Sequence, residues 1–546
     1  MAEAIGIAIL TWLGASTATA AAYGAVVGTA VMMVGMTALS MGIQAMMPRP
    51  SPPGWENLSG ITLMSYGSNE ASRVIYGETV VSGTVLAKVL SGPNNEYLHI
   101  LIGLAGHEIE SVSDVWLGDT LSTDARFTGY ARLLYYTGAA DQAASPELLA
   151  EVPVWTADHR LRGIAYLYVR LKWNANVWVS GVPNIKAKVK GRKVYDPRTG
   201  TTAWSANGAL CRLDHLIGTR PLASGTLPIG IGATLSEVDE PSWCTAATIA
   251  DEDVPLAAGG TQNRYVCNGS FATDQRPIDV AGDLASATGG IQTVYRQGKY
   301  YGYVAAYEAP VLELDADDLR GELSISARPS RRDLFNTVTG SFVDKNNFYQ
   351  PTPFPEVSNA AYLAEDGERL VKDIVLPYTD DFAMAQRLAK IVLERGRRAT
   401  SIKFPGKLTV LPTAAHETLM LTIAQLGYDA EVFRITDWTL AEDGGIDLVL
   451  LIESADLYAW DAEEQALAAP PDVGSDAGKV VDPPGNFTVV DETVTEADGS
   501  QTSYLHLSWD APTDIFVVSG GRAEAKVYDN IYSEGGGTGA EGDSEI

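Results

Sequence analysis

The 546-residue chain is poor in cysteine and histidine, and this scarcity limits the chemistry open to it. Its three cysteines, Cys211, Cys244 and Cys267, are too far apart for CxxC zinc pairs and too few for a disulfide framework. We interpret them as buried thiols that pack as small hydrophobic side chains, with an iron–sulfur site or a single disulfide as the alternatives. The stretch GHEIE at 106–110 lacks the second histidine of an HExxH zinc site, because Ser111 stands there.

Motifs that would indicate an enzyme are also missing. The sequence has no GxSxG elbow, no GxxxxGK[ST] phosphate loop and no GxGxxG between a strand and a helix. The acids of LDADDLRG at 314–321 are followed by Leu319 and Arg320 where a calcium loop would continue with oxygen ligands, so we interpret them as the polar cap of a turn. We therefore predict no catalytic residue, no metal and no cofactor. A glycosidase with paired carboxylates stays an open alternative, because the distance between such carboxylates is set by the fold and not by their spacing along the sequence.

Basic residues are scarce relative to acidic ones. The 39 Lys and Arg against 68 Asp and Glu give a net charge of −29. Nucleic-acid binding draws its affinity from cationic side chains that displace counterions, so a chain of this charge has no general means of holding DNA. The simplest interpretation is that the acidic excess keeps a large protein in solution, and a role in letting DNA pass without binding is the alternative.

The first fifty residues lack acidic and basic side chains almost entirely, with none between residues 4 and 47. The start differs from a secretory signal, which opens with Lys or Arg before a much shorter apolar core. As one helix the stretch would be about twice as long as a bilayer core is thick. Gly24 and Gly28 stand four residues apart, a spacing that lets helix backbones approach closely. Flexible methionines adapt to more than one apolar partner, and this segment contains Met32, Met33, Met36 and Met41.

What the rest of the chain has in abundance is alternation of apolar and polar residues, punctuated by Gly, Asn and Pro, which predicts β-strands. Helices are predicted at 207–218, 277–289 and 379–398. The fold class we expect is mainly β with α+β domains, in several domains, after an N-terminal apolar helix. The predicted boundaries are 1–50 for the apolar helical segment, 51–165 for a β domain, 166–325 for one or more β/α domains with an insertion, 326–465 for an α+β domain, and 466–484 for a linker.

The residues after the linker, 485–546, open like a fibronectin type III domain. Leu505, Leu507 and Trp509 alternate before Pro512, as in the second strand of such domains. About 60 residues are fewer than the roughly 100 of a seven-stranded sandwich, so we expect a partial domain followed by a flexible tail.

Several separated stretches together resemble one family, the central tail hub or tip attachment protein J of lambda-like siphophages. The stretches are RVIYGETVVSGTV, YLHILIGLAGHEIESVSDVWLGD, GVPNIKAKVKGRKVYDPRTGTTAWSANGALCRLDHL, RYVCNGSFATDQRPIDVAGDLASATGG, DLRGELSISARPSRRDLFNTVTGSFVDKNN, AQRLAKIVLERGRR and ADLYAWD. Their order runs from about Arg73 to Asp461, and GRKVYDPRTG with WSANGAL is the most specific part.

The resemblance implies a virion protein at the distal tip of a tail: a homotrimeric baseplate hub that closes the tail tube and opens for genome ejection. Its implied partners are the distal tail protein and other tail-tip proteins, the tape measure protein, and tail fibres or a receptor-binding protein. DNA would pass through without specific binding. Aromatic residues concentrate at interface cores, so Tyr166, Tyr168, Trp173 and Trp178 are candidate subunit-interface residues, with burial in each domain's own core as the alternative.

Two features depart from the family pattern. The given sequence stops where family members often continue into a long receptor-binding region, so we expect host recognition to belong to another fibre or to residues outside this sequence. Its apolar start stands where the family has a polar segment. We hypothesise that this start is a plug in the tail lumen, bundled through Gly24 and Gly28, that enters the host membrane on ejection. Two other readings compete with the hub: a cell-wall hydrolase embedded in the tip, and a membrane-anchored bacterial surface β-protein.

Overall fold

The computed structural model describes residues 64–65, 70–178, 181–222, 225–326, 331, 333–398, 400–466, 488–495 and 501–508. The chain divides into two units, Met1–Ala468 and Ala469–Ile546, each with most of its contacts inside itself. The predicted apolar helix with Gly24, Gly28, Met32, Met33, Met36 and Met41, and the predicted linker, lie outside the described residues. Every described helix is too short or too polar to cross a bilayer.

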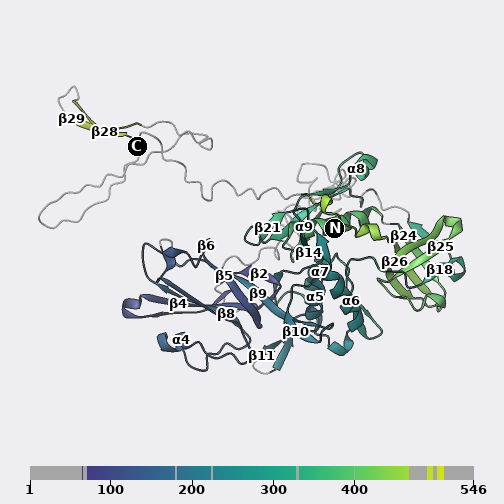
Figure 1. Ribbon diagram of the computed structural model, residues 1–546, viewed down its shortest axis with the longest axis horizontal. Coiled ribbons are helices and arrows are strands. Elements are labelled where there is room, and N and C mark those ends of the chain that lie inside the picture. The colour runs from purple at the N-terminus through teal and green to yellow at the C-terminus, as the bar shows by residue number, and fades with distance from the viewer. Residues whose placement is uncertain are drawn as a thin grey trace, which may run out of the picture. The chain divides into compact units, whose positions relative to one another are not determined.

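Strands dominate the described part of the first unit, and helices are few, so the prediction of a mainly β, multidomain chain is confirmed (Figure 1). The first strands are β1 Arg73–Tyr76, β2 Glu78–Val81, β3 Thr84–Ser91, β4 Tyr97–Ala105, β5 Ile109–Leu117, β6 Thr120–Leu121, β7 Ala131–Tyr136, β8 Ala165–Lys172, β9 Ile185–Asp196 and β10 Thr201–Trp204. Gly77 and Gly83 separate β1, β2 and β3 with φ of 58° and 71°, a left-handed conformation that favours glycine.

Two sheets of this region face each other across one core, and we call the pair the sandwich. One sheet has the order β3-β4-β8-β7, and the other has the order β10-β9-β5-β6 with β2 paired to β9. The shared core contains Ile100, Ile102, Val169, Ile109 and Val189. Strands on both sides of residue 165 belong to these sheets, and the predicted domain boundaries stay predictions.

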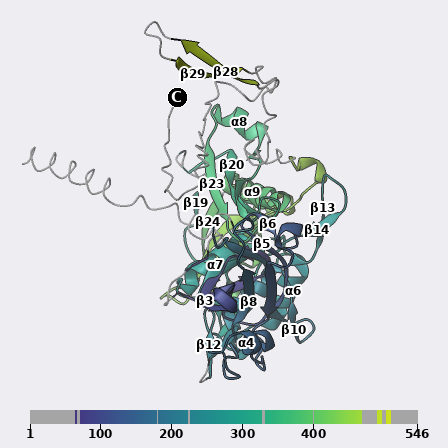
Figure 2. The ribbon, with the colours of Figure 1, turned by 90° about the vertical axis from the view of Figure 1, so that its left-hand side faces the viewer.

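The middle of the first unit is helical and has a core of its own. Its helices are α5 Gly208–Ile217, α6 Glu240–Ala250, α7 Pro277–Ser286, α8 Ala360–Asp366 and α9 Phe382–Arg397, whereas α4 Pro146–Glu151 packs on the sandwich. Asn207 caps α5 and Asp381 caps α9, each accepting from a backbone N–H of the first turn. α9 packs against β20 (Thr337–Asp344), and Figure 2 shows the two side by side. α5, α7 and α9 contribute Leu210, Leu284 and Leu388 to one core.

Short strands surround these helices. They are β11 Thr219–Leu222, β12 Gly225–Pro228, β13 Asp253–Pro255, β14 Thr261–Asn263, β15 Gly269–Ala272, β16 Val294–Arg296, β17 Lys299–Tyr301, β21 Gln350–Pro353, β22 Val357–Ser358 and β23 Val371–Leu376. The alternating stretch 290–307 favours one long strand by its pattern, but it contains the hairpin β16–β17, because Gln297 and Gly298 turn the chain with φ of 51° and 79°.

A second β region follows, which we call the six-stranded sheet. Its order is β18-β25-β26-β27-β24-β19, formed by β18 Glu313–Asp315, β19 Ser324–Ser326, β24 Ser401–Gly406, β25 Thr418–Ile423, β26 Tyr428–Leu440 and β27 Ile446–Ile452. Its core includes Phe404, Leu421, Phe433 and Leu448. The β-branched and apolar residues of KLTVL at 407–411 favour a strand, and this prediction is wrong: Leu408–Val410 form a 3₁₀ turn in which Leu408 is exposed and only Val410 is buried.

In the second unit, β28 Thr488–Thr495 and β29 Gln501–Ser508 form an antiparallel hairpin in full register. The rest of the fibronectin-like prediction lies outside the described residues.

Candidate interaction surface

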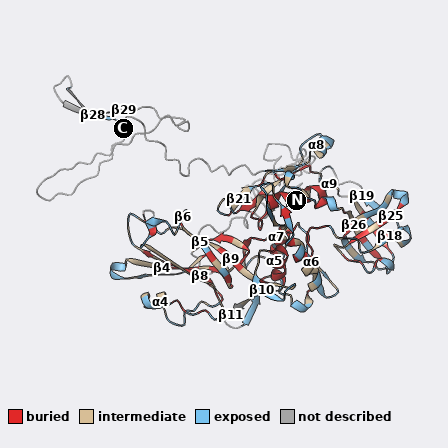
Figure 3. Cartoon of the chain, viewed as in Figure 1, coloured by how far each residue is buried: buried red, intermediate tan, exposed pale blue. Residues whose placement is uncertain are grey.

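Buried residues concentrate where β5, β8 and β9 lie and around α5, whereas turns and strand ends are exposed (Figure 3). Within the described ranges, no three Asp, Glu, His or Cys side chains come together as metal ligands. The remaining candidate features of the described residues are buried polar networks, surface aromatic residues and hollows.

His107, the histidine of GHEIE, is a buried structural link. Its Nε2 accepts from the backbone N–H of Ile75 at 3.0 Å, and its Nδ1 lies 2.8 Å from the carbonyl oxygen of Glu108. A neutral ring with the proton on Nδ1 satisfies both contacts. Burial lowers the pKa of His107 to about 3, which favours that neutral ring. The interpretation of this motif as something other than a zinc site agrees with its geometry.

His99 forms the contact that most resembles a catalytic pair. Its Nε2 lies 2.7 Å from Ser91 Oγ, and its Nδ1 lies 2.8 Å from the phenol oxygen of Tyr168. A serine hydrolase places a carboxylate on Nδ1 to stabilise the imidazolium, whereas here a phenol that accepts from Arg132 occupies that position. Burial lowers the pKa of His99. The pair therefore serves packing between β3, β4 and β8.

The three cysteines are free thiols in the structure, with Cys211 and Cys267 buried and Cys244 half-buried. A hydrogen bond with Cys267, together with burial, raises the pKa of Cys211. A thiol with a raised pKa is a poor nucleophile and a poor metal ligand.

The four predicted interface residues lie in different environments. Tyr166 and Tyr168 are buried on the second face of β8, where Leu148 and Val152 from the α4 segment cover them. Trp178 is buried as well, stacked on Phe127 with ring centroids 5.5 Å apart. A subunit interface at these four positions stays a prediction, and Trp173 is the member whose side chain is exposed.

Trp173 is 66% exposed, although its backbone N–H is bonded to the carbonyl oxygen of Glu96 at 2.8 Å. The backbone is thus fixed and the indole faces solvent. At the same end of the sheet, Leu90 of the edge strand β3 is also exposed. Rigidly held aromatic residues in solvent are typical anchors of protein–protein contacts, so we take Trp173 and Leu90 as the candidate interaction surface.

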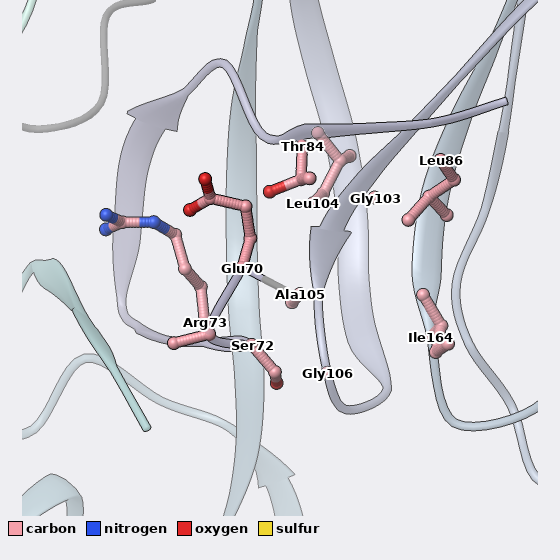
Figure 4. A pocket seen from close by; sticks show the side chains of 11 residues that line it. Glu70, Ser72, Arg73, Thr84, Leu86, Gly103, Leu104, Ala105, Gly106 and Ile164 are labelled. Carbon is pink, nitrogen blue, oxygen red and sulfur yellow. The ribbon is translucent and has the colours of Figure 1, made fainter. Parts of the chain in front are cut away.

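A hollow of about 230 Å³ lies at the other end of β3 and β4. Leu86, Gly103 and Ile164 form its apolar side, and Ser72 and Arg73 its polar side (Figure 4). Arg73 and Glu70 extend side by side away from the apolar wall (Figure 4). Sequence reasoning missed this hollow, because it is assembled from segments that no local motif connects.

Comparisons with known proteins bear on the fold alone. No family model matches the chain, and no curated protein matches it. Among solved structures, it is similar to a chain from the virion of a native gene transfer agent particle, with a TM-score of 0.52 and 18% identity over 79% of this chain and 97% of that chain. This similarity shows a shared fold.

Weaker similarities involve two tail proteins. One is the tail protein from Neisseria meningitidis MC58, with a TM-score of 0.27 and 11% identity over 71% of this chain and 97% of that one. The other is the 43 kDa tail protein of prophage MuSo2 from Shewanella oneidensis, with a TM-score of 0.25 and 9% identity over 70% and 98%.

Proposed function

We propose that this chain is a structural protein of a phage-like virion and belongs to its tail. The observation that carries the proposal is the fold shared with a chain of the gene transfer agent virion, of which 97% is covered. The order of motifs from Arg73 to Asp461 supports the same class independently of the fold.

Within that class we propose the role of a tip hub. Three copies close the distal end of the tail tube, dock tip proteins and fibres, and open for genome ejection. The described residues support a scaffold rather than an enzyme, because the polar groups examined above, at His99, His107 and Cys211, hold elements together. The net charge of −29 supports passage of DNA without binding.

The apolar segment 1–50 fits this role as a lumen plug that contacts the tape measure protein and then enters the host membrane. Deleting residues 5–47 should leave tails assembled and impair DNA entry. Normal infectivity of the deletion would remove the plug from the proposal.

Trp173 gives the sharpest test of self-association. Mass photometry of the full chain should find particles of three chains, and Trp173→Ser should shift them to single chains, because a central aromatic anchor often contributes about 2 kcal/mol or more to an interface. Tyr295→Ser is the matched control, since Tyr295 is similarly exposed, at 59%, on β16. A trimer that survives Trp173→Ser would refute this surface, and a wild-type monomer in the presence of its tail partners would refute the hub.

Two competing roles have separate tests. A peptidoglycan zymogram with the purified chain should show no cleared band if the role is structural. A membrane-anchored surface protein would fractionate stably with the inner membrane when it is expressed without tail partners. A tail protein should not.

A further inference from the structure

A second hollow, of about 150 Å³, lies where strands β2, β5 and β9 of the sandwich meet the turn between β20 and β21. We call it the aromatic hollow, because Trp116, Phe348 and Tyr349 line it together with charged side chains. Trp116 belongs to β5, whereas the other two rings belong to the turn. Ligand sites often lie where two packed parts of a protein meet, and this hollow has that position.

The turn holds Phe348 and Tyr349 in a left-handed conformation, with φ of 50° and 55°. Such a conformation costs free energy for a residue with a side chain, so it persists only where other contacts impose it. Here the N–H of Tyr349 donates to the carbonyl oxygen of Asp344 at 2.8 Å. The ring of Phe348 is 49% exposed and meets that of Trp116 edge to face, with centroids 6.2 Å apart. The aromatic surface is therefore fixed before any ligand arrives.

Three polar groups of the aromatic hollow are uncommitted. The carboxylate of Asp114, the indole N–H of Trp116 and the side-chain amide of Asn346 have no hydrogen bond or ion pair to any residue that the structure describes. A carboxylate accepts hydrogen bonds, an indole N–H donates, and an amide does both. The hollow thus presents donors and acceptors beside its aromatic rings.

The charged groups disfavour an ionic ligand. Lys188 pairs with Glu78 at 2.8 Å, and Lys345 pairs with Asp381 at 2.9 Å. A cation that entered the hollow would meet these two ammonium groups, and an anion would meet the unpaired carboxylate of Asp114. A neutral hydroxyl group meets neither penalty, because it donates to a carboxylate and accepts from an N–H.

The volume and the rings together fit a single sugar ring. Pockets for drug-sized molecules begin at about 300 Å³, so a hollow of about 150 Å³ that is open to solvent suits one six-membered ring. A pyranose has C–H groups on its faces, which pack on aromatic surface, and hydroxyl groups around its edge, which form hydrogen bonds.

We propose that the aromatic hollow binds one hexopyranose ring, with its C–H face on Phe348 and its hydroxyl groups on Asp114 and Asn346. The ring is either a free monosaccharide or the terminal unit of a glycan. The proposal goes beyond the tail role and does not depend on it.

The test is saturation-transfer-difference NMR with the full chain and glucose, galactose, mannose or N-acetylglucosamine, each added singly. At least one sugar should receive saturation at its ring C–H protons in a saturable way. Asp114→Ala should weaken its binding about tenfold or more, as expected for a hydrogen bond to a charged group. Phe348→Gly, which suits the left-handed backbone, should weaken it about three- to tenfold through the lost aromatic contact. Asp158→Ala is the matched control, because Asp158 is exposed like Asp114 and its carboxylate has no bond to a described residue.

The absence of saturable transfer to all four sugars overturns the proposal. Transfer that is unchanged in both Asp114→Ala and Phe348→Gly also overturns it, because the sugar then binds elsewhere. Choline and inorganic phosphate, added at constant ionic strength, should leave the sugar bound, and displacement by either would show that the hollow selects a charge and would reject a neutral ligand. Methyl glycosides of the bound sugar separate the two sources: retained binding identifies a terminal glycan unit, and lost binding identifies a free monosaccharide.

Discussion

The sandwich and the six-stranded sheet each contain an arginine–glutamate network, and the two networks differ in their access to solvent. In the sandwich, Glu151 at the end of α4 accepts from Arg132 at 2.9 Å and from Arg170 at 3.0 Å, and its side chain is 28% exposed. In the six-stranded sheet, Arg434 and Glu453 pair at 2.6 Å and are 5% and 3% exposed. The first network lies between α4 and a face of its sheet, where solvent reaches it, whereas the second is enclosed by protein.

The enclosed pair joins the six-stranded sheet to the preceding chain. Arg434 also donates to the carbonyl oxygens of His416 and Ala306, at 2.8 and 2.7 Å. The comparison teaches that similar residues serve two purposes. The network that solvent reaches positions α4 on its sheet, and the buried pair fixes the six-stranded sheet to the chain that precedes it. Buried ion pairs are costly to break because one charge is left without a partner, while exposed pairs contribute little.

Of the substitutions at the two networks, the largest effect is expected at the enclosed pair. Arg434→Met leaves Glu453 buried without its partner and should lower the free energy of unfolding by about 3–5 kcal/mol, measured by urea denaturation with tryptophan fluorescence. Arg369→Met is the control, because its pair with Glu356 is about half exposed on both sides, and it should cost at most about 1 kcal/mol. Equal losses for the two variants would show that burial does not set the difference.

Acid should weaken both regions through one buried histidine each. Burial lowers the pKa of His107 to about 3 and that of His416 to about 4, against 6.5 in an unfolded chain. Below pH 6.5 the unfolded chain binds protons that the folded chain does not, so stability falls as pH falls, until about pH 4 for His416 and about pH 3 for His107. The expected slope is about 1.4 kcal/mol per pH unit for each histidine. Urea denaturation between pH 7 and 4 should show a shallower slope in the double variant His107→Gln, His416→Gln, and an unchanged slope would contradict this origin.

A smaller loss is expected at the sandwich network. Glu151→Gln removes the charge that pairs with Arg132 and Arg170 and should cost about 1–2 kcal/mol, because solvent reaches the network. Asp119→Asn is the control in the same sandwich: Asp119 is 92% exposed and pairs with Lys186, so a change within about 0.5 kcal/mol is expected. A loss at Glu151 as large as that at Arg434 would remove the distinction between the two networks.

The smallest change in folding stability is expected at Trp173, whose indole is exposed. Trp173→Ser should alter the unfolding free energy of the isolated chain by about 0.5 kcal/mol or less. Trp178→Ser, which removes the buried ring stacked on Phe127, should cost about 3–5 kcal/mol in the same urea experiment. Comparable losses would mean that Trp173 is part of the chain's own core.

Local patterns predicted many elements of the fold. Asp315 and Asp318 form the capping box of the turn at LDADDLRG, which is the polar cap that the sequence predicts. The helices α5 and α9 begin close to their predicted starts, and Asn207 and Asp381 cap them. Pro277 begins α7 as the sequence indicates. These signals are reliable because capping and turn formation depend on residues close in sequence.

Alternation along β8 was read correctly, but what covers its second face was not. Ala165 and Leu167 face the sandwich core, and Tyr166 and Tyr168 face the other side. Alternation assigns faces and leaves open whether solvent, another subunit or another segment lies on them. Here the α4 segment covers the two tyrosines, and its six-residue helix carries too short a pattern to be recognised.

By itself, the sequence determined the mainly β class, the acidic balance, the helix starts and the resemblance to tail hubs, because each depends on composition or on residues near one another. Only the tertiary structure decided that Tyr168 is covered while Trp173 is exposed, and that Arg434 is enclosed while Glu151 meets solvent. Burial and proximity depend on segments far apart in the chain, and these meet only when the sheets and helices pack.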